Sequence, residues 1–255
     1  MRNIVFLSVI LIFFPAVNGF SQTLKVATGE YSPTIGANLK HGGYATHMMT
    51  LAFESQGISL DVDYMPWKRA LVSTQKGDYD LSFYWFFSEE RQKSFYYGDA
   101  LIQSNIHFFH LEALNFDWQG YDDLEPYFVG LTAGYHYSSE LDVLVNAGEL
   151  NSHVTTRDID NVNMLLASRI DIFPMTLLEG FYLINNRFPP ESAKKITYHP
   201  KALSTPTGHP IFPKVNEKSL RLRQIYNQGI KEIKAKGILE EYEQKMIDGW
   251  YEQTN

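Results

Sequence analysis

Apolar residues follow two periodicities along the chain, and each predicts a different kind of element. Alternation with a period of two indicates strands; these are expected at 24–28, 58–64, 80–87, 127–132, 170–175 and 211–214. Apolar residues three and four positions apart indicate helices; these are expected at 44–57, 66–77, from 88, from near 138, and at 161–168, 177–186, 218–236 and 239–246. Because strands and helices alternate, the pattern predicts an α/β fold with a largely parallel sheet.

Glycine, proline and serine mark the expected element ends. Pro66 suits the first turn of a helix, and Gly57 and Gly77 follow helices in the manner of C-caps. Ser88 is expected to cap the next helix by accepting a backbone N–H. Pro174 is expected to stop a short strand.

Residues 1–21 have the pattern of a cleavable signal peptide. Arg2 gives a charged start, residues 4–17 are almost wholly apolar, and small residues lead to cleavage after Gly19 or Ser21. The apolar run falls short of the roughly 20 residues that span a bilayer. The alternatives are an uncleaved anchor or a buried strand. With no cysteine in the chain, neither a lipoprotein nor a disulfide is expected, and we expect a periplasmic protein.

Composition and charge narrow the classes of partner. The 255 residues carry a net charge of −7, with acidic and basic residues interspersed, so nucleic acid is not an expected partner. The histidines show no metal-site spacing, and phosphate loops, serine-nucleophile elbows and cysteine nucleophiles are absent from the sequence. We therefore expect no metal, no cofactor and no catalytic residue. With 17 Phe, 16 Tyr and 4 Trp, aromatic residues exceed core requirements, so some are expected to line a pocket.

One segment carries candidate binding chemistry. The strand at 80–87 brings aromatic side chains and a hydroxyl to its C-terminal end, and the helix that follows has Arg91 in its first turn. Ligands of open α/β sheets bind at the carboxyl ends of strands, helix N-termini favour anions, and a guanidinium can bind a carboxylate through two hydrogen bonds. The segment predicts a carboxylate receptor with aromatic walls. The alternative is that Arg91 is a solvated residue paired with a glutamate.

The orientation of the strand's side chains is less determined. Strict alternation sends Phe83 and Trp85 to one face and Ser82 and Tyr84 to the other. Because the strand ends here, we expect Ser82 and Trp85 near the ligand. Trp67 lies on the apolar stripe of its helix and is expected in the core.

The order of these motifs resembles the extracellular solute-binding proteins of family 3, the polar amino-acid type of periplasmic binding protein. In the first half, the resemblance rests on a G-x-x-D strand, an S-x-E-R turn and a following aromatic residue: Gly77, Asp80, Ser88, Glu90, Arg91 and Phe95. Further similar segments follow in the same order at 130–135, 168–171, 211–214 and 236–239. Together they cover nearly the whole chain after residue 21.

The resemblance implies a two-lobed periplasmic binding protein type II fold with two crossover segments. Lobe 1 would hold residues 23–103 and 210–255, and lobe 2 residues 109–204, with crossovers at 103–108 and 205–209. The ligand would lie in the cleft, and the lobes would close over it by a hinge motion. The implied partners are a small-molecule solute and an ABC transporter permease or membrane sensor, with the protein itself a monomer.

The resemblance also implies roles for individual residues. Arg91 matches the arginine that binds the ligand carboxylate, and Ser88 belongs to the same turn. Tyr31 falls where an aromatic ring covers the ligand, and Tyr135 is the candidate from lobe 2.

The chain departs from the family at Thr176, where the aspartate that holds an α-amino group is expected. We expect Thr176 to contact the ligand at this position. Glu30 or Glu179 could substitute, since an ammonium in a closed cleft needs a charged or well-placed polar partner. A carboxylate without an amine, or another small polar molecule, is the alternative ligand to an amino acid.

Three hypotheses about function follow from this resemblance. The first is a binding protein without enzymatic activity that serves an ABC importer or a sensor. The second is a dehydratase-like enzyme on the same fold, which would need Glu30, Glu179 or His136 as acid or base. The third is a degenerate paralogue that acts through a protein partner.

Overall fold

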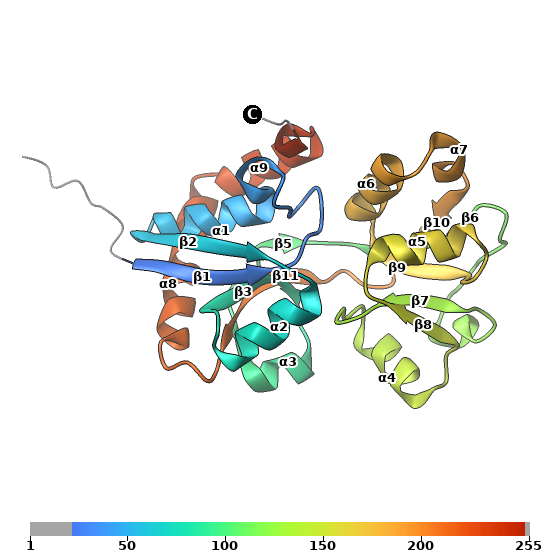
Figure 1. The fold of residues 1–255 in the computed structure, drawn as a ribbon, viewed down its shortest axis with the longest axis horizontal. Helices are drawn as coiled ribbons and strands as arrows, with labels where there is room; N and C mark the ends of the chain where they lie inside the picture. The colour runs from blue at the N-terminus through green and yellow to red at the C-terminus, as the bar shows by residue number, and fades with distance from the viewer. Residues whose placement is uncertain (1–21, 253–255) are drawn as a thin grey trace, which may run out of the picture.

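The computed structural model describes residues 22–252, which form two lobes of α/β architecture connected by two passes of the chain (Figure 1). The two-lobed fold expected from the resemblance is therefore present. The expected signal peptide at 1–21 lies outside the described residues. Among residues 22–252, no helix is long and apolar enough to cross a membrane.

The first lobe is built on a mixed sheet. Its strands are β1 (Gln22–Thr28), β2 (Ile58–Tyr64), β3 (Leu81–Phe86), β4 (Phe95–Tyr97), β5 (Ile102–Gln103) and β11 (Thr207–Pro213). They follow the order β2-β1-β3-β11-β4, and β5 also pairs with β11. The pairs β1–β2 and β1–β3 are parallel, whereas β11 is antiparallel to β3, β4 and β5. The late strand β11 thus lies inside a sheet formed mainly by the first third of the chain.

The second lobe contains the other sheet, in the order β10-β6-β9-β7-β8. Its strands are β6 (Ile106–Leu111), β7 (Val129–Thr132), β8 (Ser152–Thr155), β9 (Ile172–Thr176) and β10 (Ile196–Tyr198). β7 is parallel to β8 and β9, and β6 is antiparallel to β9 and β10. The expectation of a largely parallel sheet is therefore corrected: both sheets are mixed, because the chain enters and leaves each lobe on antiparallel strands.

Helices cover both sheets (Figure 1). Those of the first lobe are α1 (Tyr44–Glu54), α2 (Trp67–Lys76), α3 (Glu89–Ser94), α8 (Ser219–Ala235) and α9 (Ile238–Ile247). Those of the second are α4 (Ser139–Ala147), α5 (Asp158–Leu166), α6 (Leu177–Arg187) and α7 (Pro190–Ala193). Short 3-10 turns occupy η1 (Lys40–Gly42), η2 (Tyr121–Leu124) and η3 (Trp250–Glu252). In the first lobe, α1 and α2 lie on opposite sides of the sheet.

Local sequence explains these elements. β1 buries Leu24 and Val26 and exposes Lys25, as a half-buried strand requires. Gly77 ends α2 with a left-handed φ of 86°. At Gly229 a side chain would overlap the carbonyl oxygen of Ala52, so this glycine allows α8 to pack closely on α1.

Two expected element ends differ in the structure. Ser88 is the N-cap residue of α3, but its side chain makes no capping bond; its backbone N–H instead donates to the Tyr97 hydroxyl at 3.3 Å. Pro174 does not stop β9, which continues to Thr176. The antiparallel pairing with β6 continues along this strand, whereas β7 pairs with it only at Ile172. A proline is tolerated where the ladder requires no N–H from it.

Candidate functional site

A cavity that is partly open to solvent lies between the two lobes. Most of its lining is aromatic. The lining residues are Tyr31, Trp67, Tyr84, Trp85, Phe86, Arg91, Ile106, Gly134, Tyr135, His136, Tyr137, Met175 and Thr176. Most of these residues follow or end β1, β3, β7 and β9, while Trp67 follows β2 and Ile106 begins β6. The cavity therefore lies at the carboxyl ends of strands from both sheets, where α/β proteins commonly bind ligands.

Tyr84 changes the direction of the side chains at the end of β3. Its φ is 70°, a left-handed value that is rare for an aromatic residue. Alternation breaks here, so Tyr84, Trp85 and Phe86 all line the cavity. Ser82 is instead fully buried beneath them, and its hydroxyl accepts a hydrogen bond from Trp85 Nε1 at 2.7 Å.

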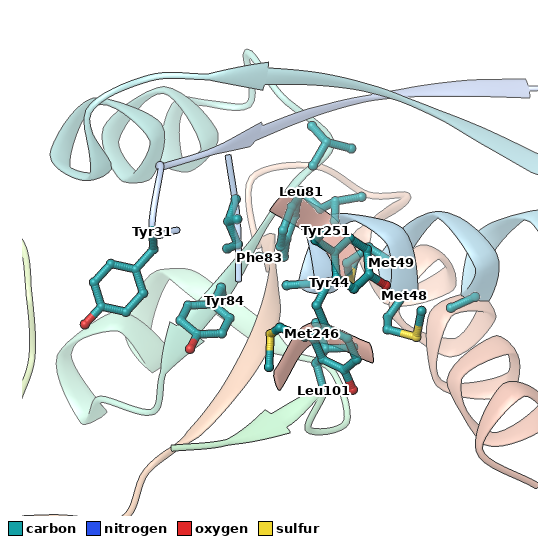
Figure 2. Packing of buried hydrophobic residues seen from close by; sticks show 14 of the residues in the cluster. Tyr31, Tyr44, Met48, Met49, Leu81, Phe83, Tyr84, Leu101, Met246 and Tyr251 are labelled. Atoms are coloured by element: carbon teal, nitrogen blue, oxygen red, sulfur yellow. The ribbon is translucent and has the colours of Figure 1, made fainter. Parts of the chain in front are cut away.

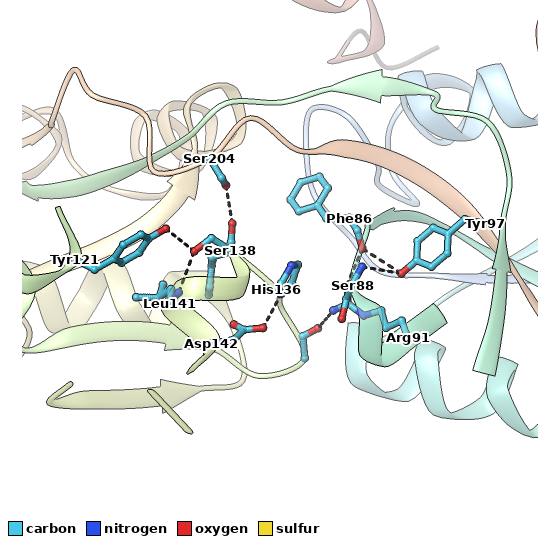
Figure 3. Close-up of polar contacts among 12 residues, drawn as sticks. Phe86, Ser88, Arg91, Tyr97, Tyr121, His136, Ser138, Leu141, Asp142 and Ser204 are labelled. Atoms are coloured by element: carbon cyan, nitrogen blue, oxygen red, sulfur yellow. Dashed lines mark hydrogen bonds and ion pairs between the residues drawn. The ribbon is translucent and has the colours of Figure 1, made fainter. Parts of the chain in front are cut away.

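Arg91 contacts both lobes (Figure 3). Its Nη1 donates to the Phe86 carbonyl at 3.0 Å, and its Nη2 donates across the cleft to the Gly134 carbonyl at 2.7 Å. The guanidinium carbon lies 4.9 Å from the ring centroid of Trp85. Burial lowers the pKa of Arg91, yet an arginine stays charged. Among residues 22–252 no carboxylate forms a salt bridge with Arg91, so this positive charge is available to an anion in the cavity.

Trp67 lines the cavity rather than lying wholly in the core as expected. Its indole lies over Gly29, where a side chain would overlap the ring. Its Nε1 donates to the Glu30 carbonyl at 3.3 Å. The turn after β1 therefore sets the position of Trp67, and the Glu30 backbone takes part rather than its carboxylate.

Hydroxyl groups surround the carboxylate of Glu179 next to the cavity. Thr34 and Thr176 both donate to it, and the Tyr84 hydroxyl donates to it at 3.2 Å. Tyr31 joins this network through a 2.7 Å bond between its hydroxyl and Thr176. Burial raises the pKa of Glu179, and the bonds from Thr176 and Thr34 oppose that rise. Since Thr34, Tyr84 and Tyr31 belong to the first lobe, Glu179 is a point of contact between lobes.

A second carboxylate, Asp158, lies at the start of α5. It accepts hydrogen bonds from the Thr132 hydroxyl at 2.6 Å and the Tyr135 hydroxyl at 2.8 Å. Burial raises its pKa to about 6. Asp158 therefore adds negative charge behind the Tyr135 side of the cavity.

The structure brings together five of the residues expected to bind ligand. They are Tyr31, Trp85, Arg91, Tyr135 and Thr176, and all line the cavity. The other three lie outside its lining. Ser82 is covered by Trp85, Ser88 is half-buried on the α3 side, and Glu30 is exposed.

Sequence reasoning missed several residues of the site, among them Tyr84, Phe86, Tyr137 and Asp158. Tyr84 and Phe86 could not be placed by alternation because the strand twists at Tyr84. Asp158 was missed because the helix was expected to begin at residue 161, whereas α5 begins at Asp158. The signal available was the pair of acidic residues Asp158 and Asp160 just before the apolar positions of the helix, since acidic residues favour a helix N-terminus.

The enzyme hypothesis needs an acid or base in the cleft, and its three candidates are Glu30, Glu179 and His136. Glu30 is exposed, and Glu179 is engaged by hydroxyls. His136 lines the cavity, with its Nδ1 2.6 Å from an oxygen of Asp142 (Figure 3). Within residues 22–252, no cluster of three or more His, Cys, Asp or Glu residues could hold a metal ion.

Comparison with known proteins places this geometry in context. The sequence model of the bacterial extracellular solute-binding proteins, family 3, matches residues 24–249. No curated protein sequence matches the chain.

Solved structures share the fold at low sequence identity. A histidine kinase sensor domain with similarity to periplasmic binding proteins has a TM-score of 0.75 and 15% identity, covering 88% of this chain and 95% of that one. An amino acid ABC transporter substrate-binding protein from Streptococcus pneumoniae, bound to L-arginine, has a TM-score of 0.73 and 15% identity, covering 91% and 97%. The GluR0 ligand-binding core from Nostoc punctiforme, in complex with L-glutamate, has a TM-score of 0.69 and 19% identity, covering 90% and 100%.

Proposed function

Because the chain belongs to the bacterial extracellular solute-binding proteins of family 3, we propose that it captures a small carboxylate-bearing solute in the cleft between its lobes. Arg91 is the observation that supports this proposal. It is a half-buried cation at the cavity wall, and the hydrogen bonds it makes go to backbone carbonyls. A buried charge is costly without an opposite charge, and a ligand carboxylate would supply one.

The proposal places the protein in the periplasm, where it would pass its solute to a membrane protein. An ABC importer and a membrane sensor both suit this role. One structurally similar protein is an ABC transporter substrate-binding protein and another is a histidine kinase sensor domain. We propose that the chain acts by binding and release, without chemical change to the solute.

Isothermal titration calorimetry with a panel of small carboxylates tests the proposal. Replacing Arg91 by alanine should weaken carboxylate binding by at least about thirtyfold, because a charge-assisted contact in a closed cleft contributes roughly 2–5 kcal/mol. Arg157→Ala is the matched control. Arg157 is exposed, does not line the cavity, and forms a salt bridge with Asp160 (Nη2 to Oδ1, 2.7 Å). Equal carboxylate affinity in wild type and Arg91→Ala would refute the assignment of the anion site. Nuclear magnetic resonance of the incubated ligand should show no product.

A further inference from the structure

Three aromatic rings of the cavity lining, those of Tyr31, Trp67 and Tyr135, lie close together and perpendicular to one another. Tyr31 and Trp67 have centroids 6.4 Å apart and planes at 86°, and Tyr31 and Tyr135 lie 6.1 Å apart at 84°. Trp67 and Tyr135 lie 6.4 Å apart at 90°. The three rings are thus mutually perpendicular at nearly equal separations, like three walls that meet at a corner. We call Tyr31, Trp67 and Tyr135 the aromatic corner. A group enclosed by three such faces lies within the ~6 Å over which a ring face attracts a cation.

The groups behind these rings increase that attraction. The Tyr135 hydroxyl donates to Asp158 at 2.8 Å, and the Tyr31 hydroxyl is linked through Thr176 to Glu179. In the described part of the chain, neither carboxylate forms a salt bridge. Asp158, which accepts directly from Tyr135, and Glu179, which is linked to Tyr31 through Thr176, polarise these rings and make the potential in this part of the cavity negative. This end of the cavity therefore favours a positive group, opposite in sign to the anion favoured at Arg91.

The lining also restricts the kind of cation. A primary ammonium has three N–H donors and needs acceptors for them when it is buried. No Asp or Glu of the described chain lines the cavity. The Thr176 hydroxyl is bonded to Tyr31 and Glu179, and the Gly134 carbonyl is bonded to Arg91. A quaternary ammonium has no N–H to satisfy, and aromatic faces are its usual recognition elements.

The two ends of the cavity are close together. The Trp85 ring centroid lies 4.9 Å from the guanidinium carbon of Arg91 and 5.1 Å from the ring centroid of Trp67, and the two indole planes are at 89°. On the opposite wall, the carbonyl that Arg91 contacts belongs to Gly134, the residue before Tyr135. Trp85 on one wall and Gly134 on the other therefore lie between Arg91 and the three rings, so a ligand that contacts both Arg91 and the rings must be short.

From this geometry we infer that the solute is a betaine, a short carboxylate that carries a quaternary ammonium group. Arg91 binds its carboxylate, and Tyr31, Trp67 and Tyr135 enclose its methylated nitrogen. This inference rests on the proposed function, because it takes Arg91 as the carboxylate site.

Calorimetry on the purified protein with matched ligands tests the inference. Glycine betaine and 3,3-dimethylbutanoate have the same shape, but the second has a neutral carbon in place of the charged nitrogen. We expect glycine betaine or its longer homologue 4-trimethylammoniobutanoate to bind at least about tenfold more tightly than the neutral isostere. Glycine and L-alanine, which carry N–H donors, should bind more weakly than the betaines.

Two substitutions of Trp67 distinguish the effect of its aromatic face from the effect of its size. Trp67→Leu should abolish the preference for glycine betaine over 3,3-dimethylbutanoate, since it removes the π face and keeps an apolar side chain. Trp67→Phe should retain most of the preference. Because the measured quantity is a ratio of two affinities in the same variant, a general loss of folded protein does not change it.

The possible results separate this inference from the proposed function. If the neutral isostere binds as tightly as glycine betaine, or if L-alanine binds more tightly, and that binding depends on Arg91, the inference is wrong and the proposed function stands. Failure of every betaine to bind also overturns the inference. If no carboxylate binds and Arg91→Ala changes nothing, both proposals fail.

Discussion

Tyr84 combines an unusual backbone conformation with contacts on every side. Its φ of 70° places a bulky residue in the left-handed region, which costs on the order of 1–3 kcal/mol. Its ring centroid lies 5.9 Å from that of Tyr31, and its hydroxyl reaches Glu179 and Ser104, each at 3.2 Å (the packing of Tyr31 and Tyr84 is drawn in Figure 2). Gly208 leaves room for the ring. These contacts hold the strained residue in place, and the strain is what directs consecutive aromatic side chains into the cavity.

A single methyl group should disturb the site through Trp67. In Gly29→Ala the added Cβ would overlap the indole, so Trp67 must leave the position in which it packs perpendicular to Tyr31 and Tyr135. We expect ligand affinity to fall by at least about tenfold, with a change in tryptophan fluorescence, measured by titration calorimetry and emission spectra. Gly120→Ala is the control, because a Cβ there meets no atom within 4 Å. Unchanged affinity in Gly29→Ala would show that the position of Trp67 does not matter for binding.

Asp158 should make stability depend on pH. Burial raises its pKa from 3.8 to about 6. A raised native pKa means that the contribution of Asp158 to stability is full below about pH 4 and is lost as the pH rises through 6. The free energy of unfolding should therefore fall less steeply between about pH 4 and 7 in Asp158→Asn than in wild type, as measured by urea denaturation.

Other charged and titratable groups lie close to Asp158 and can contribute to the same pH dependence of stability. Glu179 raises its pKa, while the hydroxyls of Thr132 and Tyr135 lower it, and Tyr31 and Tyr137 lie within electrostatic reach. Asp122→Asn, at an exposed position of η2, serves as the control substitution. Identical pH profiles for wild type and Asp158→Asn would assign the dependence to Glu179 or to another group.

Part of the site could be predicted from sequence, and physical reasons limit the rest. Arg91 follows from its place in a short helix after an aromatic strand, and Tyr31, Tyr135 and Thr176 follow from the order of family motifs. All four line the cavity, although their roles in binding are still predictions. The aromatic corner could not be predicted, because it depends on ring positions contributed by both lobes and on the turn at Gly29.

At the scale of elements, the packing of α8 on α1 depends on one glycine. A methyl group on Gly229 would overlap the Ala52 carbonyl, and the two helices would have to separate. Gly229→Ala should lower the free energy of unfolding by about 1–3 kcal/mol, despite the better intrinsic helix propensity of alanine. Chemical denaturation measures this change. Lys231→Ala, at an exposed position of the same helix, should change stability by less than about 0.5 kcal/mol, and an equal loss in both variants would contradict the packing argument.

Long periodic segments predict elements well in this chain. The strand expected at 58–64 coincides with β2, and the helices expected at 66–77 and 177–186 match α2 and α6 within one residue at each end. Periodicity did not identify β4, β5, β8 and β10, since a strand of 2–4 residues is too short to show a period. β6 was not expected as a strand because its first residues fell in a predicted crossover, and its apolar run does not alternate.

At the scale of the whole molecule, hydrogen bonds from Thr34 and Tyr84 to Glu179 join the two lobes, and we expect them to favour a closed form over an open one. Thr34→Val keeps the shape of the side chain but removes one of the donors to Glu179, which leaves a buried carboxylate less satisfied. The open form should become more populated, and ligand affinity should fall by about threefold to thirtyfold. Small-angle X-ray scattering should show a larger radius of gyration without ligand than for wild type.

The comparison for Thr34 uses a threonine away from the cleft. Thr50→Val removes a hydroxyl that bonds only within its own helix, to the Thr46 carbonyl at 2.9 Å. Its affinity and radius of gyration should equal those of wild type. A Thr34→Val protein with the dimensions and affinity of wild type would show that Glu179 does not control closure.

The path of the chain through the two sheets also has a consequence for the order of folding. All strands of the second sheet lie between Ile106 and Tyr198, whereas the first sheet needs β11, at residues 207–213, between β3 and β4. As a chain emerges from its N-terminus, the second lobe can complete its hydrogen-bonded framework while the first still lacks an interior strand and helix α8. The lobe that begins the sequence is thus the last to be finished. A chain that stops before residue 205 would retain a whole second sheet beside an incomplete first one.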